Sequence, residues 1–397
     1  MKYIFKIFFY VACLAAGAVI MQSCRGNGTG GEEPPVPGEE ESVSRTVLVY
    51  MVATNNLGQG GAGSLNCDVS DLKEMALAAD KLNGGRVLVY HASNQSAPEL
   101  KELSDDGTWN TVCTYPEGNE SLTVQRMKKV IADTKSAAPA DDYGIVFWSH
   151  ASGWIEPGYN GRGSVQPKSF GSDGSSKINM SIPDLAEALA DSRFSFIYFD
   201  CCHMATVEVA YELRKAAPLM VASGTELPIE GMPYDLNLPA FFEKEPDLKA
   251  AAQNTFSYYA DGHSVWGPSE CYISVIDLTR MDALAAAARE VMLTAPSISR
   301  YYESAPYMRS VNSYFSIYDM GNYIDALSES DKLAALRKAY ADAVIEFHTT
   351  PKVYGLDTSR FSGLGCNIVA DADDAQRGGY TSLAWWTDVV SANPSLQ

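Results

Sequence analysis

The sequence predicts an α/β protein whose mostly parallel β-sheet is covered by helices on both faces. Three segments, 46–53, 86–93 and 194–200, are continuous apolar runs rich in β-branched and aromatic residues, a pattern typical of strands buried on both faces. Segments with helical periodicity lie between these runs, and parallel strands require such crossover helices. No period of about 20–50 residues recurs along the chain, which excludes solenoids and propellers.

The elements of the first half follow in order along the chain. After the strand at 46–53, the segment 68–82 places Leu72 and Met75 on one helical face, with Asp68 as the expected N-cap. Ser181 and Pro183 open a later helix, where the missing N–H of proline costs nothing. The other elements expected here are a helix over 121–136, a strand over 143–150, a helix over 181–190, a helix over 204–216 and a strand over 219–224.

Beyond about residue 236 the pattern becomes more helical. Strands are expected at 271–278 and around 364–372, between helical segments at 283–293, 323–327 and 332–347. The length suits either one large α/β unit or a core with an appended lobe. We divide the chain into a signal peptide (1–23), a lipidated cysteine with a flexible acidic tether (24–44), an α/β core (45–235) and a helical continuation with a small C-terminal lobe (236–397).

The N-terminus has the pattern of a secretory signal. Lys2 and Lys6 precede an apolar run that ends at Cys24 and is too short to span a membrane comfortably. The residues before Cys24 resemble a bacterial lipobox, which implies acylation of this cysteine and attachment to the cell envelope, at the outer membrane or surface of a Gram-negative cell. In the alternative, an ordinary signal is cleaved and Cys24 has no role. Residues 25–44, rich in Gly, Pro and Glu, have the composition of a flexible tether.

Composition narrows the class of partner. The formal net charge is −19, which argues against nucleic acid as a ligand and is compatible with cationic substrates. No CxxC or zinc-finger spacing occurs, and a chain this long needs no disulfide framework. We interpret the isolated Cys67, Cys113, Cys271 and Cys366 as small buried hydrophobic residues. A monomer is compatible with these features.

Reactive side chains follow two of the predicted strands. His150 ends the strand at 143–150, and Asp200, Cys201 and Cys202 end the strand at 194–200. In an open parallel sheet, ligands bind outside the carboxyl ends of the strands, so these side chains should meet at one edge. A histidine beside a cysteine can take the proton of the thiol and return it to a leaving group. The helix expected directly after the cysteines would lower the pKa of the thiol through its dipole.

The two segments that carry these residues resemble the clostripain-type cysteine peptidases of the caspase-like clan. The chain has Trp148-Ser-His-Ala-Ser-Gly-Trp154 around the histidine and Asp200-Cys-Cys-His-Met204 around the cysteines, with 52 positions between His150 and Cys202. The likeness extends through VEVAYEL (207–213), VLVYMVATNNL and VASGTELPIEGMPYD, and covers most of 45–235. It implies a caspase-like three-layer sandwich and a cysteine endopeptidase that cleaves peptides after Arg or Lys.

Matched residue by residue, the resemblance assigns roles in the site. Cys202 stands where the family has its nucleophile and His150 where it has its histidine. Asp200 matches the acid beside the S1 pocket for a basic side chain, and Glu226 and Glu230 could add charge to that pocket. The backbone N–H groups of Ala151 and Cys202 are the oxyanion-hole candidates.

Three departures from the family pattern keep alternatives open. Ala151 replaces a glycine. We interpret Cys201 as a buried neighbour of Cys202; the alternatives are that the two form a strained vicinal disulfide or that Cys201 is itself the nucleophile. His203 replaces an apolar residue and, as a cation, would favour the thiolate. A non-catalytic, caspase-like surface lipoprotein that binds a peptide or glycan is the alternative function.

No cofactor is expected. His150, Asp200, Cys202 and His203 are metal-binding in type, but the ligand spacings of zinc sites are missing. Calcium, plausible for some relatives, has no D-x-D-x-D-G loop in this chain.

Overall fold

The computed structural model describes residues 44–61, 63–118, 120–155, 169–174, 178–265, 267, 269–296, 306–309, 316–327, 330–369, 373 and 376–396. Contacts group Glu41–Gln397 into one compact unit. The signal and tether predicted for 1–43, including Cys24, lie outside the described residues. Within the described part, no helix combines the length and apolar character that crossing a membrane requires.

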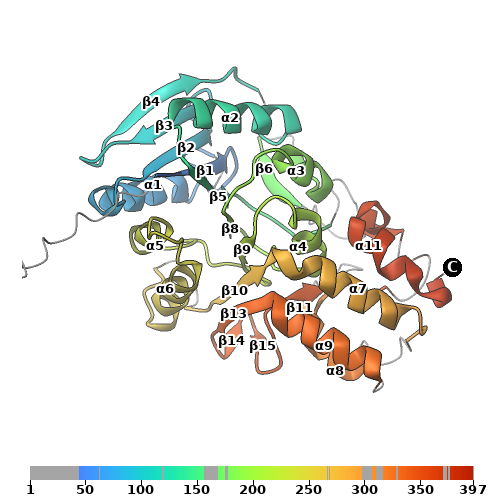
Figure 1. Ribbon diagram of the computed structural model, residues 1–397. Coiled ribbons are helices and arrows are strands. Elements are labelled where there is room, and N and C mark those ends of the chain that lie inside the picture. Colours follow the sequence, from blue (N-terminus) through green and yellow to red (C-terminus); the bar gives the residue numbers. More distant parts are fainter. Residues whose placement is uncertain are drawn as a thin grey trace, which may run out of the picture. The chain divides into compact units, whose positions relative to one another are not determined.

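A nine-stranded sheet forms the centre of this unit, in the order β13-β10-β9-β8-β5-β1-β2-β3-β4 (Figure 1). The five strands from β9 to β2 are mutually parallel, while β10 and β13 on one side and β3 and β4 on the other are antiparallel to their neighbours. The strands are β1 (Arg45–Ala53), β2 (Arg86–Ser93), β3 (Glu99–Leu103), β4 (Trp109–Thr114), β5 (Asp142–Trp148), β8 (Phe196–Asp200), β9 (Leu219–Ala222), β10 (Tyr272–Asp277) and β13 (Val344–Thr349).

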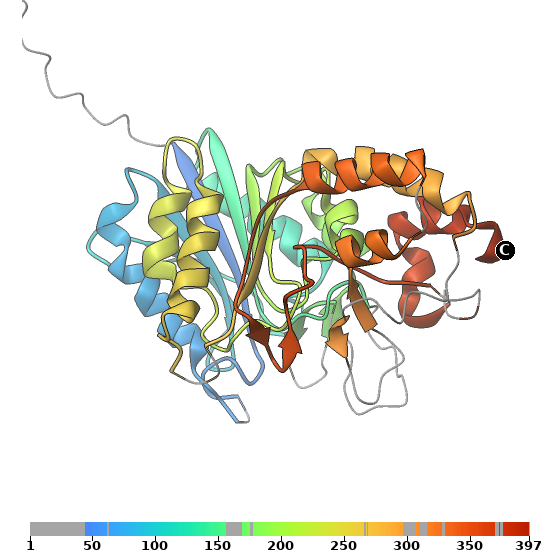
Figure 2. The ribbon, with the colours of Figure 1, turned by 90° about the horizontal axis from the view of Figure 1, so that it is seen from below.

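Helices cover both faces of the sheet, as predicted (Figure 2). Strand β1 is buried throughout; Val47 and Val49 face one core while Leu48 and Tyr50 face the other, because successive side chains of a strand point to opposite faces. One face carries α1 (Cys67–Leu77), α5 (Tyr234–Phe241) and α6 (Leu248–Ala260). The other carries α2 (Val124–Ala137), α3 (Ile182–Leu189), α4 (Val207–Leu213), α7 (Met281–Met292), α8 (Met320–Ala326), α9 (Asp331–Ala343) and α11 (Ala384–Asp388).

Short strands and 3₁₀ turns fill the connections. The small sheets are β6 (Phe170–Asp173) with β7 (Ile178–Met180), β14 (Lys352–Val353) with β15 (Leu356–Asp357), and β11 (Pro306–Arg309) with β12 (Ser316–Asp319) and β16 (Gly365–Cys366). The 3₁₀ turns are Ala79–Lys81, Leu278–Arg280, Arg377–Ser382, Val390–Ala392 and Pro394–Leu396.

The structure corrects three sequence-based predictions of element boundaries. The expected N-cap Asp68 lies inside α1, whose N-cap position is Asn66, and Asp68 is buried where it accepts a hydrogen bond from the N–H of Gln59. The helix expected over 332–347 ends at Ala343, and Val344–Thr349 instead forms the edge strand β13. A strand was expected around 364–372; of the residues described there, 364–369, Gly365–Cys366 alone forms a strand.

Helix α4 also begins later than expected. It starts at Val207, where the hydroxyl of Thr206 accepts a hydrogen bond from the N–H of Val209, and it ends at Leu213. Residues 203–206 therefore separate the cysteines from the helix. The prediction that a helix N-terminus follows Cys202 directly is wrong.

Candidate functional site

The two predicted reactive residues leave neighbouring strands at the same level. Strands β5 and β8 are parallel partners, and their last pair is Trp148 with Asp200. His150 and Cys202 each follow two residues beyond this pair. Neighbouring strands lie about 4.8 Å apart, so the register brings the histidine and the cysteine to adjacent positions at the carboxyl edge of the sheet.

The two adjacent cysteines have different environments. The sulfur of Cys202 is half-buried, lies 3.4 Å from the N–H of Leu227 and 3.9 Å from its carbonyl, and so sits against the loop that follows β9. Cys201 is only 2% exposed and donates from its thiol to the carbonyl of Phe147 at 3.1 Å. Burial, and then the charge of Asp200, raises the pKa of the Cys201 thiol well above its ordinary value. A buried, protonated thiol is a poor nucleophile, so Cys202 is the one suited to attack.

The imidazole of His150 is oriented by a residue that the sequence analysis missed. Its Nε2 lies 2.8 Å from the amide oxygen of Asn56, in the loop after β1. Because an amide oxygen only accepts hydrogen bonds, this contact places a proton on Nε2 and a lone pair on Nδ1. The rule that functional residues follow the carboxyl ends of strands could have found Asn56, since β1 is the next strand along from β5.

The loops that carry His150 and Cys202 touch each other closely. Gly153 has a φ of 69°, and a Cβ added there would lie 2.7 Å from the carbonyl oxygen of His203. Only glycine fits both this backbone conformation and this approach. The segment after His150 is also held by hydrogen bonds from Gly171 to His150 and from Ser152 to Ser169, neither of which uses the N–H of Ala151.

His203 does not assist the thiol as a cation. It is 6% exposed, has a φ of 60°, and its Nδ1 lies 3.3 Å from the carbonyl of Gly224. Burial lowers the pKa of His203 to about 4, with the Gly224 carbonyl acting in the opposite direction. The imidazole is therefore neutral at pH 7, which corrects the prediction that its charge would favour the thiolate.

Asp200, at the end of β8, is buried and fully engaged with the loop before α5. Its two oxygens accept hydrogen bonds from the N–H of Met232 and the hydroxyl of Tyr234, both at 3.1 Å. Burial raises the pKa of Asp200 to about 7, against the lowering effect of these two bonds. Both donors are neutral groups, so they do not cancel the negative charge that Asp200 acquires when it ionises.

Two further acids, both from α1, interact electrostatically with Asp200, and no sequence pattern indicated them. Asp71 accepts a hydrogen bond from Nε1 of Trp148 at 2.5 Å, and burial, then the charges of Asp200 and Glu74, raise its pKa well above the ordinary value. Glu74 accepts from the N–H of Tyr234 at 3.2 Å, and burial raises its pKa to about 7. A cation close to these three carboxyl groups would be stabilised.

The loop after β9 carries the other two predicted acids. Glu230 accepts hydrogen bonds from the hydroxyl of Ser264 at 2.9 Å and from the N–H of Val265 at 2.6 Å. Glu226 immediately precedes Leu227, whose N–H contacts the Cys202 sulfur. Its side chain is exposed by surface area, although the surrounding protein desolvates it enough to raise its pKa. Both residues thus belong to the loop that adjoins the thiol.

The remaining cysteines and His91 lie in environments that indicate a structural role. Cys67, Cys271 and Cys366 are buried as predicted, whereas Cys113 is half-buried. His91 pairs with Asp68 at 3.0 Å, between β2 and α1. Among the residues that the structure describes, no group of three or more His, Cys, Asp or Glu side chains is arranged to hold a metal ion.

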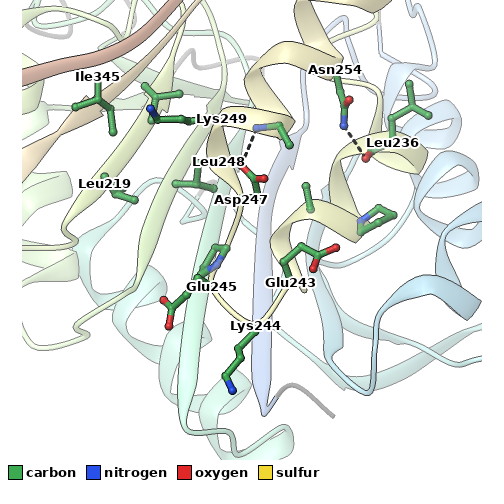
Figure 3. A pocket seen from close by; sticks show the side chains of 15 residues that line it. Leu219, Leu236, Glu243, Lys244, Glu245, Asp247, Leu248, Lys249, Asn254 and Ile345 are labelled. Atoms are coloured by element: carbon green, nitrogen blue, oxygen red, sulfur yellow. Dashed lines mark hydrogen bonds between the residues drawn. The ribbon is translucent and has the colours of Figure 1, made fainter. Parts of the chain in front are cut away.

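A hollow of about 680 Å³ lies elsewhere on the molecule, between α5, α6 and the strands β9, β10 and β13 (Figure 3). Leu219, the first residue of β9, contributes to its wall, together with Glu243, Asp247 and Ile345. The hollow is therefore next to the amino end of β9, whereas Cys202 adjoins the loop after its carboxyl end. None of the predicted site residues lines it, and we assign the chemistry to the residues around Cys202.

Known proteins resemble this chain in sequence and in fold. A model of the clostripain family matches residues 49–359. A secreted C11 cysteine protease from Bacteroides thetaiotaomicron, solved in complex with an irreversible peptide inhibitor, is 31% identical with a TM-score of 0.71, and the match covers 89% of this chain and 99% of that one. An inactive zymogen C11 protease from Parabacteroides distasonis is 28% identical with a TM-score of 0.72, over the same shares of the two chains.

A further secreted C11 protease of Bacteroides thetaiotaomicron, called iotapain, has a TM-score of 0.72 over 89% of this chain and 99% of that one, and at 19% identity it supports the fold alone. No protein with a curated description matches the chain. The caspase-like α/β architecture and the cysteine-type peptidase activity predicted from the sequence are confirmed by the family match and the two more similar structures. The chain belongs to the clostripain family of cysteine peptidases.

Proposed function

We propose that the protein is an endopeptidase in which Cys202 and His150 form the catalytic dyad. His150 takes the proton from the Cys202 thiol, and the thiolate attacks the carbonyl carbon of the scissile peptide bond. The tetrahedral intermediate collapses to a thioester as His150 passes the proton to the leaving amine. Water then attacks the thioester, with His150 again accepting a proton, and the carboxylate product and the free thiol are released.

The shared register of β5 and β8 is the observation that carries this proposal, because it brings His150 and Cys202 to adjacent strand ends. Asn56 supports it further, since a third group that fixes the tautomer of the base is a recurring part of such sites. The backbone N–H groups of Cys202 and Ala151 are our candidates for stabilising the oxyanion.

We further propose that the enzyme cleaves after Arg or Lys. Asp200 ionises near neutral pH, its bonded partners are uncharged, and the charge of Glu74 raises its pKa further, which shows that the two carboxyl groups repel each other when ionised. Glu226 and Glu230 place two more carboxylates in the loop beside the thiol. A positively charged substrate side chain would relieve the mutual repulsion of these groups.

The test measures turnover of fluorogenic peptides that end in Arg, Lys or an uncharged residue, under reducing conditions. We expect turnover of the basic peptides by the wild type, no turnover by Cys202→Ala or His150→Ala, and retained turnover by Cys201→Ala, which is the matched control. Loss of activity in Cys201→Ala with activity retained in Cys202→Ala would overturn the assignment of the nucleophile. Equal turnover of basic and uncharged peptides would overturn the proposed specificity.

The sequence of the N-terminus supports a proposal about location. We propose that Cys24 is acylated after signal cleavage and that the acidic segment 25–44 tethers the enzyme to the outer membrane or cell surface, as a monomer without a required cofactor. Incorporation of a labelled fatty acid into the wild type and its absence in Cys24→Ser would support the anchor. Unlabelled wild-type protein in the culture medium would contradict it.

A further inference from the structure

The antiparallel half of the sheet brings a hairpin to the edge that holds Cys202. Strand β9 ends at Ala222 opposite Ser274 of the antiparallel β10, so residues before β10 reach the edge at which β9 ends. Strand β13 pairs Thr349 with Tyr272, the first residue of β10, and therefore ends at this edge too. The β14–β15 hairpin follows directly and lies at the lower edge of the sheet in Figure 2, as does the loop after β1.

The turn of this hairpin presents a tyrosine in an unusual conformation. Val353 pairs with Leu356, which leaves Tyr354 and Gly355 as the two turn residues, with φ values of 46° and 81°. Two-residue turns of this kind favour Asn or Gly at the first position, and a bulky aromatic residue there is rare. The ring is 39% exposed, whereas the neighbouring Val353 is fully buried and anchors the hairpin in the core.

Glu270 fixes the turn to the start of β10. A carboxylate oxygen of Glu270 accepts a hydrogen bond from the N–H of Tyr354, and the next residue, Cys271, exchanges hydrogen bonds with Thr350. The turn is thus held by Glu270, at the edge of the sheet where β10 begins, as well as by the pairing of β14 with β15. This arrangement positions the aromatic ring without using its hydroxyl group.

Acidic groups of the site lie close to this tyrosine. Burial raises the pKa of Tyr354 above its ordinary value, and the charges of Cys202, then Glu226, Glu230 and Glu270, raise it further. The phenol therefore stays protonated while its surroundings are negative. An aromatic ring at an edge that also carries these acidic groups is a chemical environment that suits a cation, above all the flat guanidinium group, which stacks on rings.

We propose that Tyr354 is a specificity-determining residue whose ring, held in place by Glu270, contacts the basic side chain of the substrate beside Cys202. This inference rests on the proposed function and names a contact from the C-terminal half of the chain that the dyad and Asp200 do not supply. It also distinguishes the two basic side chains: stacking favours arginine over lysine.

The test compares Tyr354→Asn with Tyr354→Phe and with Leu77→Ala, a control at an exposed apolar residue of α1. Asparagine tolerates a positive φ, so Tyr354→Asn keeps the turn and removes the ring, while phenylalanine keeps the ring. Steady-state kinetics with Arg and Lys peptides are measured beside the melting temperature and the rate at which iodoacetamide, a small reagent, alkylates Cys202.

For Tyr354→Asn we expect KM for Arg peptides to rise about tenfold and KM for Lys peptides to rise less, with kcat and the alkylation rate unchanged. Tyr354→Phe and Leu77→Ala should behave as the wild type. An unchanged KM in Tyr354→Asn, or an alkylation rate that falls together with kcat, overturns this inference while leaving the proposed function intact. No turnover by the wild type would overturn the proposed function and this inference with it.

Discussion

In the parallel half of the sheet, β1, β5 and β8 each end in a loop that carries a member of the proposed dyad or its hydrogen-bond partner: Asn56, His150 and Cys202. In the antiparallel half, the same edge is reached by the residues before β10 and by the hairpin after β13, which supply Glu270 and Tyr354. The groups that we propose break the bond thus follow parallel strands, and Asp200 also ends one, whereas the antiparallel strands add Tyr354 as a further proposed substrate contact. One edge of a sheet can therefore combine loops that follow parallel strands with segments that flank antiparallel strands.

Removing the residue that orients the base should produce the largest effect in the parallel half. Asn56→Ala takes away the acceptor of the Nε2 proton of His150, so both ring tautomers become accessible and the base is misoriented. We expect kcat to fall about 10²-fold with little change in KM, and the pH profile of kcat to shift.

Asn94→Ala is the matched control for this change. The Asn94 amide supports the same loop through the carbonyls of Ala53 and Asn55 but does not contact His150. An equal loss of activity in the two variants would show that Asn56 acts only by holding the loop.

Neutralising Asp200 should affect substrate binding more than chemistry, because we propose that its charge attracts the basic side chain of the substrate and assign it no role in proton transfer. We expect Asp200→Asn to raise KM for basic peptides about tenfold or more and to leave kcat nearly unchanged. Since its pKa is about 7, wild-type KM for these peptides should fall as the pH rises through 7, and this dependence should disappear in the variant.

Asp200→Asn should weaken substrate binding but stabilise the fold at neutral and alkaline pH. The folded pKa of Asp200 lies above its ordinary value, so its favourable contribution at low pH is lost as the pH rises toward and through 7. Asparagine carries no charge to bury. Because this contribution is full only below the ordinary pKa and is already partly lost at pH 5, Asp200→Asn should exceed the wild type in melting temperature by a margin that grows from pH 5 to pH 8. A margin that stays constant or reverses would contradict this account.

The smallest expected effect concerns helix α4. Thr206→Ala removes the N-cap of α4 and should lower the free energy of unfolding by about 1 kcal/mol. Ser181→Ala, which removes the N-cap of α3 away from the thiol, is the matched control. Because α4 begins five residues after Cys202, the pH dependence of Cys202 alkylation should be the same in both variants. A shift found only in Thr206→Ala would show that the helix dipole reaches the thiol after all.

The sequence by itself determined the parallel core and the two segments that carry His150 and Cys202. Strands buried on both faces, such as β1 and β8, must be apolar at nearly every position, and this pattern is visible without a structure. The edge strands gave no such signal. Strand β13 is only half-buried, and its short apolar start continues the helical pattern of α9, so it could not be told from a helix by periodicity.

The tertiary structure alone decided which polar residues pair with one another at this edge of the sheet. Asn56 lies 94 positions before His150, and Glu270 lies 84 positions before Tyr354, separations at which sequence spacing carries no geometric information. The strand order and the antiparallel return of β10 and β13 bring these pairs together. Tertiary packing also gave the two adjacent thiols different environments, since the core buries Cys201 against Phe147 and leaves Cys202 against the loop after β9.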